Sequence, residues 1–327
     1  MENVPLISIC IPIKNRFQYI RNLLNAIENL DYPKKKVKLI FVDDFSIDGT
    51  YEALVKWKNE VEEKYYKMVL MRERTNIPQA RNLCIKNMEG DYLLFWDSDV
   101  IPPRDLLSEM ISIMEENPTI GMIGADYEYD PSLKVRYKPI VNKETHAVYM
   151  GFTLIRREVF NVAGFFDENL SVGEDTEFGI RVTEKTDYKI VWAPRPVLHL
   201  KSPSDVKRRI RAWMAYNFHV RAEEYYKSFN RLPRILKIRL AYYIGLPLTI
   251  VLSLVLFITS VQVLAITPLI YLAPSLYPLI RTKGLKEGVA MWLTFNLPTG
   301  LALSYGFLFI ALNKLLRSKE SRRDQRN

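Results

Sequence analysis

Two carboxylates one residue apart, in Asp97-Ser98-Asp99, are the side chains of this sequence best suited to chemistry. They follow an apolar run, Tyr92 to Trp96, which predicts a buried strand. Ionised carboxylates are costly to bury without a partner, so the pair predicts a ligand at the end of that strand. Mg²⁺ and Mn²⁺ prefer oxygen ligands and often combine one or two protein carboxylates with phosphate. The alternative is a helix start, because Pro102-Pro103 and Asp105 follow.

Two other acidic segments can likewise be interpreted either as part of a functional site or as the cap of a helix. Asp43-Asp44 ends a predicted strand and precedes a polar turn, Ser46 to Thr50, so a carboxylate there can reach ribose hydroxyls or a base edge. The alternative is a helix cap made by Asp48 or Thr50. Gly173-Glu174-Asp175 lies in a loop that enters a helix, where an acid can act as general base toward a hydroxyl or, again, cap the helix.

The elements that position these acids alternate in type over the first hundred residues. The predicted strands are Leu6 to Ile13, Val37 to Val42, Met68 to Met71 and Tyr92 to Trp96; the predicted helices are Arg16 to Leu30, Thr50 to about Tyr66 and Ile77 to Met88. This order predicts an α/β fold with a mostly parallel sheet and helices on both faces. Ligands of such sheets bind at the carboxyl ends of the strands, which is where Asp43 and Asp97 lie.

Taken in order, these segments resemble glycosyltransferase family 2 and its Rossmann-like GT-A fold. The resemblance covers about the first 200 residues. It rests on Ile9-Cys10-Ile11-Pro12-Ile13-Lys14-Asn15-Arg16, Val42 to Thr50, Asn76 to Asp99, Gly151 to Arg157, and Gly164 to Glu168 followed by Gly173-Glu174-Asp175. One departure is Asn76-Ile77-Pro78, which has Pro where relatives often have Gly, so the local backbone stays open.

The resemblance implies a role for each candidate residue. Pro12, Asp43 and Arg81 would line the nucleotide site, and Asp97 would face the nucleotide-sugar. Asp99, with Asp97, would bind Mg²⁺ or Mn²⁺. Asp175 would be the catalytic base of an inverting displacement, with Glu174 beside it. His199 follows the last core strand, where relatives can carry a metal-binding histidine; a structural histidine is the alternative.

The last 127 residues differ sharply in charge and hydropathy. The whole chain carries a formal charge of +9, but residues 1–200 hold 26 Lys/Arg against 31 Asp/Glu, whereas residues 201–327 hold 20 against 6. The basic excess flanks three uncharged apolar runs, 240–260, 263–280 and 288–312, each long enough to cross a bilayer. This location favours a membrane over a nucleic-acid partner. The third run contains Pro298 and Gly300, which leaves a re-entrant segment open.

These patterns predict a catalytic domain at 1–203, a basic interfacial segment at 204–239, a transmembrane region at 240–312 and a basic tail at 313–327. No signal peptide precedes the first strand, so we expect a multi-pass membrane protein with a cytoplasmic catalytic domain. Cys10 and Cys84 are interpreted as buried free thiols.

The expected reaction moves a sugar from a UDP- or GDP-sugar to a lipid-linked or cell-surface glycan. Arg208 to Trp213 only partly matches the Gln-x-x-Arg-Trp motif of processive synthases, which argues against polymer extrusion. A polyprenyl phosphate acceptor stays the alternative, and a non-catalytic membrane scaffold is a third interpretation.

Overall fold

The computed structural model describes residues 4–129, 138–168 and 174–200, together with residues 285 and 289. The chain divides into two compact units, Met1–Ser202 and Pro203–Asn327. The predicted interfacial segment, the three apolar runs and the basic tail lie outside the described residues, apart from 289. Among the helices of the described residues, none is long and apolar enough to cross a bilayer.

The first half of the catalytic unit confirms the predicted alternation of strands and helices. Its elements are β1 (Ile7–Ile13), α1 (Phe17–Glu28), β2 (Val37–Asp43), α2 (Thr50–Val61), β3 (Lys67–Arg72), α3 (Ile77–Lys86) and β4 (Tyr92–Trp96), with short 3₁₀ turns at Lys34–Lys36 and Glu62–Lys64. β1 pairs in parallel with both β2 and β4, and β2 pairs in parallel with β3. The carboxyl ends of these four strands therefore meet at one edge of the sheet.

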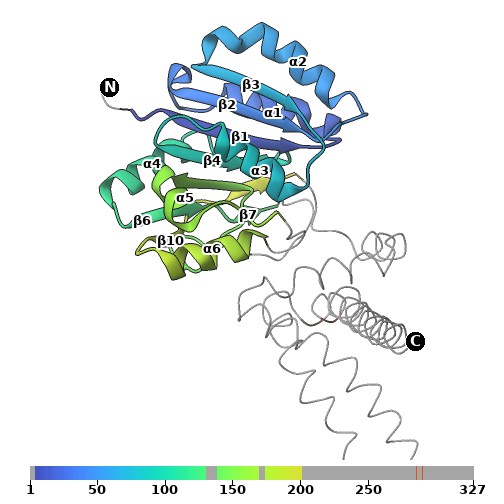
Figure 1. The fold of residues 1–327 in the computed structure, drawn as a ribbon. Coiled ribbons are helices and arrows are strands. Elements are labelled where there is room, and N and C mark those ends of the chain that lie inside the picture. The colour runs from blue at the N-terminus through green and yellow to red at the C-terminus, as the bar shows by residue number, and fades with distance from the viewer. Residues whose placement is uncertain (1–3, 130–137, 169–173, 201–284, 286–288, 290–327) are drawn as a thin grey trace, which may run out of the picture. The chain divides into compact units, whose positions relative to one another are not determined.

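The second half completes the sheet with strands that run antiparallel as well as parallel to their neighbours. It contains β5 (Val100–Ile101), α4 (Leu106–Glu116), β6 (Ile120–Gly124), β7 (Tyr127–Glu128), β8 (Glu144–Thr145), β9 (Phe152–Arg156), α5 (Arg157–Ala163), α6 (Glu174–Lys185), β10 (Lys189–Trp192) and β11 (Val197–His199). The large sheet has the order β3-β2-β1-β4-β9-β6-β10-β8 (Figure 1). β9 runs antiparallel to β4 and β6. A second, small sheet of order β5-β11-β7 lies beside the end of β4.

Helices cover both faces of the large sheet, as predicted. The apolar residues of α1, α2 and α4 belong to one buried cluster, and those of α3, α5 and α6 belong to the other. β1 shows how one strand serves both clusters, because successive side chains point to opposite faces. Its Ile9 and Ile11 join the first cluster and its Cys10 joins the second.

The start of α3, where Pro78 made the backbone hard to predict from the sequence, is a well-formed helix cap. Asn76 accepts a hydrogen bond from the backbone N–H of Gln79, and the Gln79 side chain accepts one from the N–H of Asn76. Proline is tolerated in the first helical turn because no carbonyl of the helix needs its missing N–H. Pro78 therefore lies in the first turn without interrupting α3.

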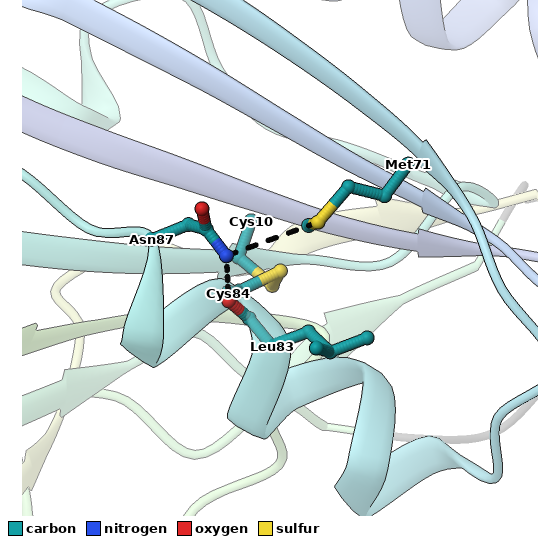
Figure 2. The surroundings of a disulfide bond; sticks show 5 residues. All are labelled: Cys10, Met71, Leu83, Cys84 and Asn87. Atoms are coloured by element: carbon teal, nitrogen blue, oxygen red, sulfur yellow. Dashed lines mark hydrogen bonds between the residues drawn. A yellow bond between two sulfur atoms is a disulfide. The ribbon is translucent and has the colours of Figure 1, made fainter.

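The two cysteines are not free thiols, which corrects the interpretation of the sequence. Cys10 on β1 and Cys84 on α3 form a disulfide with a Cα–Cα distance of 5.6 Å (Figure 2). Both residues are fully buried. Asn87 closes the same end of α3 by donating to the Leu83 carbonyl. Local sequence patterns do not reveal the pairing, because 74 residues separate the cysteines and the contact between β1 and α3 brings them together.

We expect loss of this disulfide to lower the free energy of unfolding of the full-length chain by about 2–4 kcal/mol, because it closes a long loop in the unfolded state. The measurement is denaturant unfolding with and without reductant. The Cys10→Ala/Cys84→Ala chain is the control, since reductant should not alter its midpoint. An oxidised wild-type chain no more stable than the reduced one would contradict the prediction.

Candidate active site

A cleft of about 390 Å³ opens where the carboxyl ends of β1, β2 and β4 meet. Its lining includes five of the residues predicted from the sequence: Pro12, Arg81, Asp97, Asp99 and His199. It also includes Asp44 of the predicted Asp43-Asp44 pair and residues for which the sequence predicted no individual role, among them Lys14, Arg16, Thr75 and Asn76. The cleft is thus where the parallel order of the strands predicts a ligand site.

Asp97-Ser98-Asp99 forms a turn between β4 and β5. The Asp97 N–H donates to the Gly151 carbonyl at 2.8 Å, and the Asp97 carbonyl accepts from the Val100 N–H at 3.2 Å. The helix that follows, α4, begins only at Leu106, with Asp105 at its N-cap position. The alternative that the triplet caps a helix is therefore wrong, and its two carboxylates are left to face the cleft.

His199 lies at the end of β11, a strand of the small sheet, and lines the cleft. β11 runs antiparallel to β5, with His199 opposite Val100, and the Leu200 N–H donates to the Asp99 carbonyl at 2.9 Å. This pairing brings a residue one hundred positions away beside the triplet. The His199 ring also packs edge-on against Tyr127, with 4.8 Å between ring centroids.

The electrostatics of the triplet suit a bound cation. Burial raises the pKa of Asp97, and the neighbouring Asp99 carboxylate raises it further. Arg81 is the strongest of the positive neighbours that oppose this rise. A divalent cation would relieve the repulsion between the two carboxylates, and carboxylates with an imidazole are a donor set that Mn²⁺ accepts. In the part of the chain that the structure describes, no group of three or more His, Cys, Asp or Glu side chains is already arranged around a metal position.

Asp43, predicted to contact the nucleotide, does not line the cleft. It is fully buried, its Oδ2 accepts from the Ser46 N–H at 3.1 Å, and Arg72 lies 3.5 Å from the same oxygen. The next residue, Asp44, lines the cleft instead and pairs with Lys14 at 2.5 Å. Because consecutive side chains of a strand point to opposite sides, a shift of one residue exchanges a buried acid for a ligand-facing one.

In the turn after β2, the N-cap position of α2 is Gly49, without a side-chain cap, so neither Asp48 nor Thr50 is the N-cap residue of that helix. Asp48 accepts hydrogen bonds from the backbone N–H of Thr50 and of Phe17 and from the Thr50 hydroxyl. Burial raises the pKa of Asp48, but the hydrogen bond from the Thr50 hydroxyl, followed by those from the Phe17 and Thr50 N–H groups, lowers it overall. Thr50 accepts from the Arg16 N–H and Ser46 accepts from the Asn15 N–H, both at 2.9 Å. Side chains of this turn therefore satisfy the backbone N–H groups at the start of α1. Positive charge for a ligand comes instead from the Lys14 and Arg16 side chains, which line the cleft.

Arg81 and Glu174 form a buried ion pair with 2.7 Å between Nη1 and Oε1. Their side chains are only 7% and 12% exposed. Burial raises the pKa of Glu174, and Arg81 opposes the rise. The Arg81 guanidinium also lies over the rings of Phe95 and Phe166. Glu174, implied to be catalytic by the resemblance, is therefore held in place by Arg81.

Asp175 follows Glu174 in the first turn of α6 and is not among the residues lining the cleft. Its Oδ1 accepts from the Thr176 N–H at 2.7 Å, so it does act locally at the helix start. Asp175 and the triplet nevertheless act on the same side chain, Tyr127. Burial is the main cause of the raised pKa of Tyr127, and the carboxylates that raise it further are Asp97, Asp99 and Asp175.

Removing the buried cation of the Arg81–Glu174 pair should destabilise the protein strongly. We expect Arg81→Met to lower the free energy of unfolding by about 3–5 kcal/mol, because it leaves Glu174 buried without its partner. Arg81→Met/Glu174→Gln should recover most of this loss in denaturant unfolding. Arg195→Met is the matched control: its ion pairs with Asp105 and Glu109 are exposed, so it should cost less than about 1 kcal/mol. A double variant as unstable as Arg81→Met would show that Glu174 is not the cause.

The fold and cleft define an α/β protein that holds an arginine and paired carboxylates at the carboxyl edge of its sheet. The family model for glycosyl transferase family 2 matches residues 8–171, and that for glycosyl transferase family group 2 matches residues 142–308. The chain belongs to glycosyl transferase family 2.

Individual relatives are distant. Glycosyltransferase AglE of Haloferax volcanii is 25% identical over 204 residues, which are 59% of this chain and 66% of AglE. Poly(ribitol-phosphate) β-N-acetylglucosaminyltransferase TarS of Staphylococcus aureus is 30% identical over 110 residues, 34% of this chain and 19% of TarS. The matches thus span less than two thirds of both relatives. A dolichyl N-acetyl-α-D-glucosaminyl phosphate 3-β-D-2,3-diacetamido-2,3-dideoxy-β-D-glucuronosyltransferase of Methanococcus voltae is 24% identical over 230 residues, 64% of this chain and 71% of that protein.

One solved structure supports the GT-A-like fold. Mannosyltransferase PcManGT of Pyrobaculum calidifontis, solved with GDP-Man and Mn²⁺, superposes with a TM-score of 0.55. The match covers 96% of this chain and 88% of that protein at 18% identity, so the similarity concerns the fold.

Proposed function

We propose that this chain is an inverting glycosyltransferase that moves a sugar from a UDP- or GDP-sugar to a lipid-linked or cell-surface glycan. The observation that carries the proposal is the cleft at the carboxyl edge of the sheet. It combines two acids of a single turn with Arg81 and His199 in a chain of glycosyl transferase family 2.

The donor side of the cleft suits a nucleoside diphosphate. Asp44 supplies a carboxylate that accepts from the N–H groups of a base or from ribose hydroxyls. Lys14 and Arg16 supply cations for the phosphates, and these cations lie on the same lining as Asp44. Asp43 supports this arrangement, because its Oδ2 accepts a hydrogen bond from the Ser46 N–H in the turn that includes Asp44.

Asp97, Asp99 and His199 are the residues that would hold Mg²⁺ or Mn²⁺. When bound, the cation neutralises negative charge that grows on the departing diphosphate. PcManGT was solved in complex with GDP-Man and Mn²⁺, which supports the proposal of a divalent cation here.

In the proposed displacement, a hydroxyl oxygen of the acceptor forms a bond to the anomeric carbon of the donor sugar. The bond from that carbon to the diphosphate oxygen breaks, and its electron pair leaves with the nucleoside diphosphate. Attack comes from the opposite face, so the anomeric configuration inverts. Asp175 takes the hydroxyl proton as general base. The ion pair with Arg81 fixes Glu174, and hence the first turn of α6 that carries Asp175.

The acceptor and the membrane location are proposed from the sequence and the relatives. The three apolar runs with basic flanks favour a multi-pass membrane protein whose catalytic domain works at the cytoplasmic face. The Methanococcus voltae relative is named for a dolichyl-phosphate-linked sugar acceptor, and TarS is named for poly(ribitol-phosphate). Both support an acceptor that is already a glycan or polyol chain.

The test is a panel of UDP- and GDP-sugars offered to the full-length chain with Mg²⁺, Mn²⁺ or EDTA. We expect the nucleotides of one base to raise the melting temperature and to be hydrolysed slowly, in both cases only with metal. Saturating ligand stabilises by about 3 kcal/mol at a hundred times Kd, which is easily measured. If no nucleotide-sugar binds under any condition, the non-catalytic scaffold gains support. A sugar-phosphate-lipid product labile to mild acid would instead identify a polyprenyl phosphate glycosyltransferase.

A further inference from the structure

An aromatic cluster is formed by Tyr127, Tyr149 and Trp192, and the charges of Asp97, Asp99 and Asp175 act on its Tyr127. The rings of Tyr127 and Tyr149 stack with 5.2 Å between centroids and only 6° between planes. Trp192 packs against Tyr149 at 5.6 Å and is itself buried. Tyr149, in contrast, is 45% exposed. An aromatic ring that packs on other rings on one side and is exposed to solvent on the other can stack with a bound ligand.

Backbone contacts connect this cluster to the turn formed by Asp97-Ser98-Asp99. Gly151 accepts the Asp97 N–H through its carbonyl, and its missing side chain makes room for Tyr127. A Cβ at Gly151 would lie 2.1 Å from the Tyr127 hydroxyl oxygen. Tyr127 therefore packs directly against the residue that anchors the triplet. Its β7 strand also pairs with β11, which carries His199.

The charges around the exposed ring decide what it can bind. Burial raises the pKa of Tyr149 first, and the charged groups that raise it further are Asp126 and Asp175, both carboxylates. Both carboxylates repel a phosphate group, and Asp175 can also accept a hydrogen bond from a hydroxyl, whereas Asp126 is buried and already accepts from the N–H groups of Tyr127 and Ile140. A sugar ring offers hydroxyls at its edge and apolar C–H groups on its face, and the C–H face packs on an aromatic ring.

We propose that Tyr149, supported by Tyr127, is the platform on which the acceptor stacks, and that the acceptor group is a sugar rather than a bare polyprenyl phosphate. The proposal rests on the glycosyltransferase function proposed above. It assigns the acceptor to the neighbourhood of Tyr149, outside the lining of the cleft, while Asp44 and Lys14, which line the cleft, serve the donor.

The test measures how acceptors stimulate release of nucleoside diphosphate by the full-length chain with the donor found in the panel. The probes are octyl glycosides of glucose, mannose, galactose and N-acetylglucosamine, and farnesyl phosphate. We expect at least one glycoside, but not farnesyl phosphate, to stimulate release. Tyr149→Ala should raise the KM for that glycoside about tenfold or more, which is the scale of one lost aromatic contact. Tyr149→Phe keeps the ring and should stay within about threefold of the wild type.

Two controls separate the acceptor proposal from the proposed function. Tyr66 is similarly exposed, at 48%, but precedes β3 at the opposite edge of the sheet, so Tyr66→Ala should leave the glycoside KM unchanged. The dissociation constant of Tyr149→Ala for the nucleoside diphosphate should match that of the wild type. Stimulation by farnesyl phosphate alone, or an unchanged glycoside KM in Tyr149→Ala, would overturn the platform while leaving the transferase intact. A chain that neither binds nor turns over any nucleotide-sugar would overturn the proposed function itself.

Discussion

Asp99→Asn is expected to lower sugar transfer about 10²–10³-fold, with the remaining activity no longer increased by Mg²⁺ or Mn²⁺. Asp99 is 7% exposed and lies two residues from Asp97 in a turn that backbone hydrogen bonds hold rigidly. Asparagine keeps the shape of the side chain but removes the charge that would attract the cation. The measurement is release of nucleoside diphosphate as a function of metal concentration, which separates weaker metal binding from a slower reaction.

Asp91→Asn is the matched control for this variant. Asp91 precedes the same strand, β4, at its opposite end and is exposed. The substitution removes one negative charge from the same domain, so a general effect of charge would appear in both variants. An Asp99→Asn chain with wild-type metal dependence would show that the triplet does not bind the cation.

Asp175→Asn is expected to reduce transfer by about 10²–10⁴-fold, the usual contribution of a general base. Affinity for the nucleotide-sugar should change little, because Asp175 is not among the residues that line the donor cleft. Asparagine can still accept the hydrogen bond from the Thr176 N–H through its carbonyl oxygen, so α6 should begin as before. The measurement is a single-turnover rate at saturating donor and acceptor, alongside the donor dissociation constant.

Two comparison variants test whether the loss belongs to the carboxylate of Asp175. Glu184→Gln removes an exposed acid from the last turn of the same helix and should retain the wild-type rate. Glu174→Gln removes the adjacent acid, and its effect should appear first as lower stability, because it leaves Arg81 without its ion-pair partner. Transfer by Asp175→Asn at the wild-type rate would refute the assignment of the base.

The sequence was sufficient for the elements whose pattern is local. The apolar runs of β1, β2, β3 and β4 and the helical spacing of α1, α2 and α3 determine each element by itself. Their alternation then requires a parallel sheet with its strand ends at one edge, so the position of Asp97 and Asp99 followed from the sequence. Family motifs added Pro12, Arg81 and His199, and all of these line the cleft.

Only the tertiary structure could decide contacts between distant segments. Three contacts join residues that are more than twenty positions apart: the Cys10–Cys84 disulfide, the Arg81–Glu174 ion pair and the stacked Tyr127 and Tyr149 rings. The local spacing of residues in the sequence does not predict contacts of this kind. The choice between Asp43 and Asp44 was equally beyond the sequence, because two adjacent acids look alike until the strand's orientation is known. Local spacing thus determined which carboxylates end the strands. Packing decided which of them face a ligand, because burial and charge pairing depend on neighbours that the chain supplies from elsewhere.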